Sequence, residues 1–305
     1  MDQIQSMRVF ARVVEAGTFT KAAESLDMPK GTVTKLVQHL EARLKVRLLN
    51  RTTRRVTVTP DGAAYYERTA RLLNDLDDIE ASMTNAQASP SGRLRVDVGT
   101  SVAGLIIIPA LAEFYKRFPD IQLDLGVSDR PVDLITDNVD CVIRGGDLVE
   151  QSLVARRIGN LSLITVATPA YLQQHGTPQH PDELDGPKHR TINYFSARTG
   201  RPFPHVFEKD GQTLEIAGRY QLAVNESNAH TSAVLAGLGV TQAALFAIAP
   251  HLERGELVEV LSEWKHPPIP VHVVYPPNRH LSAKVRAFVD WAAELFSRHP
   301  HLQRS

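Results

Sequence analysis

Two helix breakers, Gly17 and Pro29, divide the beginning of the chain into three short segments. The apolar positions in them are Ile4, Met7, Phe10, Val13 and Val14, then Phe19, Ala22, Ala23 and Leu26, then Val33, Leu36, Val37 and Leu40. Their spacing predicts three amphipathic helices, the first of which ends at Gly17. Thr18 is expected to cap the second helix, and Pro29 suits the first position of the third. Short helices joined by a tight turn predict a helix-turn-helix.

The outward face of the predicted third helix is polar and basic. It carries Lys30, Thr32, Thr34, Lys35 and Gln38. Lysine neutralises phosphate, and hydroxyl and amide groups form hydrogen bonds with base edges. We therefore expect these five residues to contact double-stranded DNA rather than to form a merely solvated surface.

A basic turn follows the third helix. Between residues 51 and 59, β-branched residues alternate around a turn that contains Arg54 and Arg55, which predicts a hairpin. A charged hairpin is usually a solvated sheet edge when it stands alone. Beside a helix-turn-helix, Arg51, Arg54 and Arg55 suit the DNA backbone or a minor groove. The sequence thus predicts a winged helix-turn-helix in residues 1–60.

The charge of the chain is unevenly distributed, although its sum is zero. Residues 1–60 contain 11 Lys and Arg against 5 Asp and Glu, residues 61–90 contain 2 against 6, and residues 91–305 contain 21 against 23. A basic head of this kind is the electrostatic footprint of nucleic-acid binding. The longest strongly apolar run, residues 102–111, is shorter than the roughly 20 residues of a membrane span, and the N-terminus lacks the apolar core of a secretion signal. We therefore expect a cytoplasmic protein with no membrane partner.

Residues 61–87 contain no proline and predict one long helix. Its apolar seam, with steps of four and three residues, is Tyr65, Thr69, Leu72, Leu76, Ile79 and Met83. A period of 3.5 residues favours packing against a partner helix, over about 40 Å here. The seam predicts a dimer, and the alternative is a helix that lies on its own domain. Residues 88–92 are small and helix-breaking, which predicts a domain boundary.

Strand and helix signals alternate beyond residue 92, which predicts a parallel sheet with flanking helices and room for a second unit. Strands are expected at residues 94–98, 121–127, 140–144, 161–167, 191–196, 219–224 and 271–275. Helices are expected at residues 101–118, 132–137, 169–175, 227–236 and 282–296.

Polar side chains follow three of these strands. They are Thr100 and Ser101, then Ser128 and Arg130, then Asn225 and Ser227. Ligands of open parallel sheets bind beyond the carboxyl ends of the strands, where helix N-termini supply free N–H donors. These residues are therefore candidates for holding a small polar or anionic ligand, and ordinary helix caps are the alternative.

Several runs of the sequence match a family pattern. They are Met7-Arg8-Val9-Phe10, Val13-Val14-Glu15-Ala16-Gly17-Thr18-Phe19-Thr20-Lys21-Ala22-Ala23, Leu40-Glu41 and Arg51-Thr52-Thr53-Arg54. In these runs the chain resembles the LysR-type transcriptional regulators. The resemblance implies an α/β protein with an N-terminal winged helix-turn-helix (1–60), a long linker helix (61–90) and a C-terminal two-lobed effector domain (91–305) like the periplasmic binding proteins. Lobe I would comprise residues 91–160 and 263–305, and lobe II residues 161–262.

The resemblance also implies a function. Such proteins are sequence-specific regulators that pair as dimers or tetramers on a promoter, respond to a small-molecule coinducer held between the lobes and can contact RNA polymerase. This sequence departs from the family pattern at Pro29, where serine is common, and at Gly31, where proline is common. Lys45 and Leu49 stand where glycine and phenylalanine are usual. The base preference of a relative therefore cannot be carried over.

An enzyme is the first alternative function. Residues 99–103 resemble a nucleophile elbow with Ser101 as a serine hydrolase's nucleophile, but Ala103 stands where a glycine belongs, and no glycine-rich oxyanion loop precedes it. We therefore expect no enzymatic activity and no cofactor. An architectural DNA-binding protein, without promoter-specific regulation, stays open as the second alternative.

Histidine and cysteine give no further site. His175, His180 and His189 are irregularly spaced, fit no zinc site and are expected to be solvated. Cys141 lies between apolar neighbours, which predicts burial rather than redox sensing.

Overall fold

A computed structural model describes residues 2–51, 56–84, 89–134, 137, 139–146, 153–276 and 281–303. The chain divides into two compact units, Met1–Ala88 and Ser89–Ser305. None of the helices in the described ranges is both long and apolar enough to cross a membrane.

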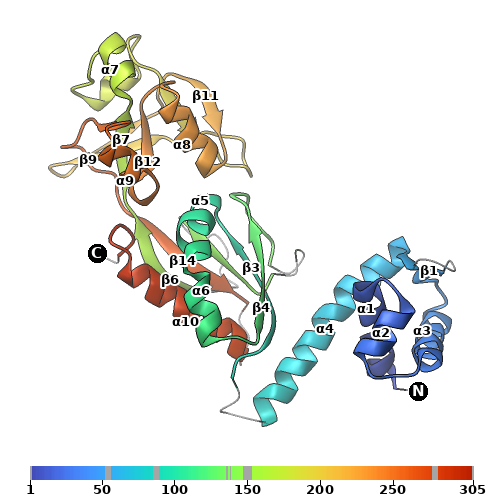
Figure 1. The fold of residues 1–305 in the computed structure, drawn as a ribbon. Coiled ribbons are helices and arrows are strands. Elements are labelled where there is room, and N and C mark those ends of the chain that lie inside the picture. Colours follow the sequence, from blue (N-terminus) through green and yellow to red (C-terminus); the bar gives the residue numbers. More distant parts are fainter. Residues whose placement is uncertain are drawn as a thin grey trace. The chain divides into compact units, whose positions relative to one another are not determined.

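Three helices form the N-terminal unit's helix-turn-helix, as predicted (Figure 1): α1 Gln3–Ala16, α2 Phe19–Ser25 and α3 Lys30–Leu44. Gly17 ends α1 in the left-handed conformation, with φ of 68°, and the Thr18 side chain caps α2 by accepting from the Lys21 amide. The inward residues predicted for α3 are all buried. Pro29 was expected to be the first residue of α3, but it is the N-cap, because its ψ of 134° is extended.

A two-stranded antiparallel hairpin follows α3, which confirms the predicted wing. It consists of β1 Leu49–Arg51 and β2 Val56–Val58. The Glu41 carboxylate of α3 accepts from the amides of Leu48 and Leu49, so the hairpin begins at a defined place against the helix. Residues 52–55 lie outside the described residues.

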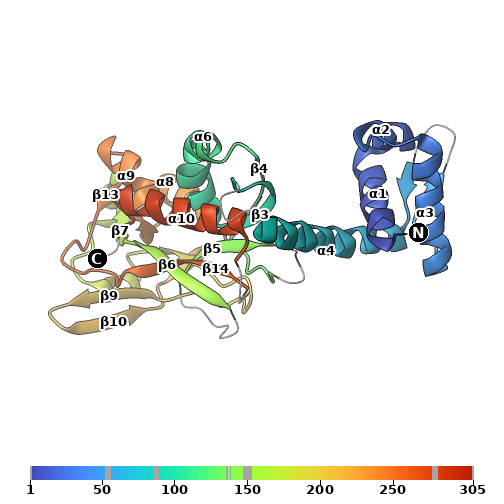
Figure 2. The ribbon, with the colours of Figure 1, turned by 90° about the horizontal axis from the view of Figure 1, so that it is seen from below.

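The long helix α4, Pro60–Thr84, confirms the prediction of one continuous helix and packs against α1 in the same unit (Figure 2). The Phe10 and Tyr65 ring centroids are 5.7 Å apart, and the Tyr66 hydroxyl donates to Glu15 at 3.0 Å. Gly62 is required where α4 passes the hairpin, because a Cβ there would lie 2.0 Å from the Leu48 carbonyl oxygen.

A five-stranded sheet forms lobe I of the C-terminal unit, in the order β4-β3-β5-β14-β6. Its strands are β3 Gly92–Val98, β4 Ile121–Val127, β5 Cys141–Gly145, β6 Val154–Leu161 and β14 Ile269–Tyr275. β3 is parallel to β4 and β5, but β14 is antiparallel to both β5 and β6. The expectation of a parallel sheet was therefore wrong for half of it, because the chain returns from lobe II and inserts β14 from the opposite direction.

Two helical segments cover one face of this sheet (Figure 1). One is a continuous run of α5 Thr100–Val102, the π-helical η1 Ala103–Ile107 and α6 Ile108–Arg117, and the other is α10 Ala283–Arg298. Phe114 joins them, with ring centroids 4.9 Å from Trp291 and 5.8 Å from Phe288. Cys141 is buried in this core, as predicted, and burial raises the pKa of its thiol.

In lobe I, one predicted helix is absent from the described residues and one strand was not predicted. Within 132–137, the described residues form no helix but a turn closed by the bond from the Asp137 amide to the Asp133 carbonyl, and the Asp137 carboxylate accepts from the Asp133 amide. Strand β6 was missed because Arg156 and Arg157 interrupt any apolar alternation at this edge.

Lobe II is built from short elements. In order they are β7 Leu163–Ala167, α7 Pro169–His175, η2 Pro181–Leu184, β8 Thr191–Tyr194, β9 His205–Lys209, β10 Gln212–Ile216, β11 Tyr220–Val224, α8 Ser227–Leu235, β12 Thr241–Ala244, α9 Leu245–Glu253 and β13 Val258–Glu259. They form a sheet ordered β12-β7-β13, a parallel pair of β11 and β8, and a hairpin of β9 and β10. The chain crosses between the lobes twice, from β6 to β7 and from β13 to β14 (Figure 1).

Candidate functional site

The outward face of α3 is polar and accessible. Lys30, Thr32, Lys35 and Gln38 are all exposed, because α3 buries its apolar stripe in the head. Thr34 is half-buried, and its hydroxyl donates to the Lys30 carbonyl at 2.9 Å. That bond uses the only hydroxyl proton, so Thr34 offers an outside partner its oxygen lone pairs and its methyl group.

The arginines of the hairpin can be placed only in part. Arg51 lies in β1, but the position of its side chain is not described, and Arg54 and Arg55 lie outside the described residues.

The predicted seam of α4 divides into two parts. Tyr65 packs against the hydrophobic core of the head, and Thr69 is buried, as is Leu73, which the heptad pattern missed. Thr69 and Leu73 are only 4% and 6% exposed, whereas Leu72 is 52% exposed and Leu76 is half-buried. Steps of four residues from Tyr65 therefore follow the buried face of α4. The side chains of Ile79 and Met83 are not described.

The two lobes meet at the N-termini of their helices. The Ser101 hydroxyl in lobe I donates to Oδ1 of Asn228 in lobe II at 2.9 Å, and the Ser101 amide donates to the Ser227 hydroxyl at 3.1 Å. Asp129 accepts from the Thr100 amide at 2.7 Å and from the Ser227 amide at 2.6 Å. The structure thus brings Thr100, Ser101 and Ser227 together, and we call these residues with Asp129 and Asn228 the lobe junction.

The other three candidates lie around the lobe junction. Ser128 accepts from the Arg130 amide at 3.1 Å in a local turn, and Asn225 is half-buried between β11 and α8. The Arg144 guanidinium is ion-paired with Asp97 and donates to the Arg130 carbonyl at 3.3 Å. These contacts hold the loop after β4 against the end of β5.

Sequence reasoning missed three residues at or beside the lobe junction. Asp129 lies in the polar strand end 128–130 that the sequence indicates, but only its neighbours Ser128 and Arg130 were candidates, because hydroxyl, amide and guanidinium groups were expected to hold the ligand. Asn228 is the second residue of α8, directly after the predicted candidate Ser227. Tyr194, at the end of β8, was not singled out, and burial and the negative charge of Asp129 raise the pKa of its phenol.

Behind the lobe junction, lobe II contains buried polar side chains. His230 of α8 lies 2.8 Å from the Thr241 hydroxyl, and His205 lies 3.2 Å from Oδ1 of Asn193. Burial lowers the pKa of His205 to about 4 and also lowers that of His230, so both are neutral near pH 7. Of His175, His180 and His189, which were expected to be solvated, His189 is buried, so the expectation was wrong for this residue.

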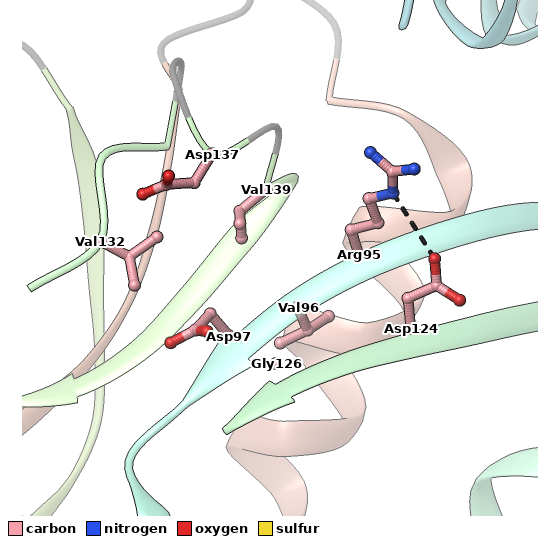
Figure 3. Close-up of a pocket in the computed structure, with 8 residues that line it drawn as sticks. All are labelled: Arg95, Val96, Asp97, Asp124, Gly126, Val132, Asp137 and Val139. Atoms are coloured by element: carbon pink, nitrogen blue, oxygen red, sulfur yellow. Dashed lines mark ion pairs between the residues drawn. The ribbon is translucent and has the colours of Figure 1, made fainter. Parts of the chain in front are cut away.

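A separate hollow of about 320 Å³ lies on the face of the lobe I sheet away from its helices (Figure 3). It is lined by Arg95, Val96, Asp97, Asp124, Gly126, Val132, Asp137 and Val139. Within the lobe, Arg95 is paired with Asp124 at 3.5 Å and Asp97 with Arg144, and the Asp137 carboxylate accepts from the Asp133 amide. The lobe junction, where both lobes contribute donors, is therefore the stronger candidate for a ligand site.

Both units of the chain match family models. Residues 4–63 match the bacterial regulatory helix-turn-helix protein of the lysR family, and residues 87–297 match the LysR substrate binding domain. The chain therefore belongs to the LysR family of transcriptional regulators, with a helix-turn-helix DNA-binding domain and a substrate-binding effector domain.

Full-length relatives have the same organisation. The chain is 41% identical over 303 residues to an HTH-type transcriptional repressor of Pseudomonas aeruginosa, covering 99% of this chain and 95% of the relative. Among solved structures, it is similar to the full-length virulence activator AphB of Vibrio cholerae, with a TM-score of 0.59 at 30% identity over 96% of this chain and 99% of that one. CrgA of Neisseria meningitidis matches with a TM-score of 0.59 at 31% identity, covering 95% and 97% of the two chains.

Proposed function

We propose that this regulator binds a spaced palindrome as a dimer and responds to a small-molecule coinducer bound at the lobe junction. The observation that carries the proposal is the contact of Ser101 with Asn228 and Ser227, which joins the two lobes directly. A ligand that enters between the lobes must change these hydrogen bonds. Its binding energy then biases the angle between the lobes.

In this proposal, α3 lies in the major groove and the hairpin lies beside it. Lys30 and Lys35 neutralise phosphates, while Thr32, Thr34 and Gln38 contact base edges. Arg51, Arg54 and Arg55 add contacts to the backbone or minor groove. The exposure of four of the five α3 residues supports this assignment.

The partner helix in the dimer is a second copy of α4, and the contact begins at Leu72, which is exposed, and Leu76, which is half-buried. Ile79 and Met83 continue the seam, and Tyr65 stabilises the head against α4. Two heads held by one pair of helices read two half-sites, which favours a palindromic operator.

Coinducer binding then affects the promoter by changing how the dimers assemble. A changed angle between the lobes alters how two dimers pair as a tetramer, and this pairing sets how far bound DNA is bent and whether the protein contacts RNA polymerase. The regulator would act in the cytoplasm without catalysing a reaction. The Ser101 hydroxyl donates its proton to an amide oxygen, and an amide is too weak a base to activate a nucleophile.

The test is a selection of genomic fragments with purified protein, followed by footprinting at fixed salt. We expect one protected palindrome near a promoter, and the protection should disappear in the double variant Thr32→Ala/Lys35→Ala. The matched control is the double variant Thr199→Ala/Lys188→Ala, which changes two exposed residues of the other unit. Salt-sensitive binding without a preferred site would favour an architectural protein, and absence of binding would contradict the proposal.

A further inference from the structure

One carboxylate in the C-terminal unit is shared by two helices from different lobes. Oδ1 of Asp129 accepts from the Thr100 amide at 2.7 Å, and Oδ2 accepts from the Ser227 amide at 2.6 Å. Asp129 and Thr100 belong to lobe I, whereas Ser227 begins α8 of lobe II. Each oxygen of the same side chain therefore accepts from a backbone amide of a different lobe, and the Tyr194 phenol of lobe II is also hydrogen-bonded to this carboxylate.

The helical run 100–117 has no cap of its own. Its N-cap is Gly99, which has no side chain, so the negative group at this N-terminus comes from the loop after β4. A Cβ on residue 99 would lie 3.2 Å from Oδ1 of Asp129, closer than ordinary contact. Glycine at this position thus allows the carboxylate to approach the helix.

The N-terminus of α8, in contrast, is capped twice. Glu226 accepts from the amides of Asn228 and Ala229, at 3.0 and 2.7 Å. Glu226 does not accept from the Ser227 amide. This amide donates instead to Asp129 of the other lobe. Because helix N-termini favour negative charge, the two helices together form an anion position, and Asp129 occupies it.

We propose that Asp129 is a built-in latch, a tethered anion that holds the two lobes together when no effector is bound. An effector with a carboxylate or similar anionic group reaches the Thr100 and Ser227 amides only by displacing Asp129. Displacement leaves the Asp129 loop free while the ligand joins the lobes in its place. This inference rests on the proposed function for its regulatory meaning, but not for its test.

The test measures amide hydrogen exchange by mass spectrometry on the full-length protein, without DNA or effector. In Asp129→Ala, peptides that cover the start of the 100–117 run and the start of α8 should both exchange about tenfold faster, the effect of losing charged hydrogen bonds. Sodium formate should restore slow exchange in both peptides, because formate can occupy the position that the side chain has vacated. Sodium chloride at equal ionic strength should not.

The matched control is Glu226→Gln, which weakens only the local cap of α8 and should speed exchange in the lobe II peptide alone. If Asp129→Ala fails to fold, Asp129→Asn takes its place. An asparagine has one acceptor oxygen for the two amides, so exchange should rise in at least one peptide and formate should have little effect.

Two results would overturn the latch. One is exchange in Asp129→Ala that rises in neither peptide or in one alone, because the carboxylate would then not link the lobes. The other is a rise in both peptides that formate reverses no better than chloride, because the position would then not be an anion position. Since neither DNA nor effector is present, these outcomes are independent of whether the proposed coinducer response is correct.

Discussion

Ser101 and Asn228 are 127 positions apart in the sequence, yet the Ser101 hydroxyl donates to Oδ1 of Asn228 at 2.9 Å. The bond joins the first helical run of lobe I to α8 of lobe II. It belongs to the lobe junction, so a ligand that enters between the lobes competes with it.

Replacing Ser101 with alanine should weaken the contact between the lobes. We expect the free energy of unfolding of the C-terminal unit to fall by about 1 kcal/mol, the net value of one hydrogen bond, with the salt dependence of DNA binding unchanged. Thermal unfolding of the full-length protein measures this. Ser128→Ala, which removes only a local turn contact, should cost less. An esterase activity that Ser101→Ala abolishes would contradict the regulator.

Replacing Leu72 with glutamate should break the dimer. Leu72 is exposed in the single chain, so the variant should fold normally. The dissociation constant of the dimer should rise by about 100-fold or more, because each of two leucines loses roughly 1.5 to 3 kcal/mol of apolar burial. Sedimentation equilibrium gives the constant. Ala63→Glu, an exposed position on the opposite side of α4, is the control. An unchanged constant would place the dimer contact elsewhere.

Replacing Arg54 with alanine should weaken binding to every DNA sequence. If Arg54 contacts one phosphate, the slope of log affinity against log salt should become shallower by about one unit. Titrations at several salt concentrations measure the slope. Arg201→Ala, an exposed arginine in the other unit, should leave it unchanged. Equal slopes for wild type and Arg54→Ala would remove Arg54 from the set of phosphate contacts.

Thr34 should recognise one base pair through its methyl group or its oxygen lone pairs, because its proton is bound to the Lys30 carbonyl. We expect Thr34→Ala to reduce discrimination at one base pair by about 1 to 3 kcal/mol. Thr34→Val keeps a methyl group, so it separates methyl contact from hydrogen bonding. Competition between operators with single changes measures the preference. A uniform loss over all operators would argue against base recognition by Thr34.

The stability of the protein should fall in acid because of His205. Its pKa is about 4 in the folded chain and near 6.5 when unfolded. The unfolded state therefore binds more protons between these values, so stability is complete above pH 6.5 and is lost as the pH falls toward 4, by at most about 1.4 kcal/mol per pH unit. His205→Gln, which keeps a donor for Asn193, should make this loss shallower in urea titrations. A parallel pH dependence in both proteins would contradict the assignment to His205.

Elements defined by local pattern were predicted well. The strand at 121–127 and the helix at 169–175 have the predicted bounds, and Gly17 and Thr18 end and cap helices as expected. The hairpin of β9 and β10 and strand β12 were missed. β12 pairs with β7, which is distant in the chain, and its local sequence does not distinguish it from a helix.

Local patterns were sufficient to predict the helix-turn-helix, the long helix and the polar ends of strands, because apolar period, capping and turn chemistry are local properties. Tertiary packing establishes which face of α4 is buried, that β14 runs antiparallel to its neighbours, and that the Asp129 carboxylate accepts from two helices. Each depends on how segments that are not neighbours in the sequence pack together. No spacing within a single segment encodes such a contact.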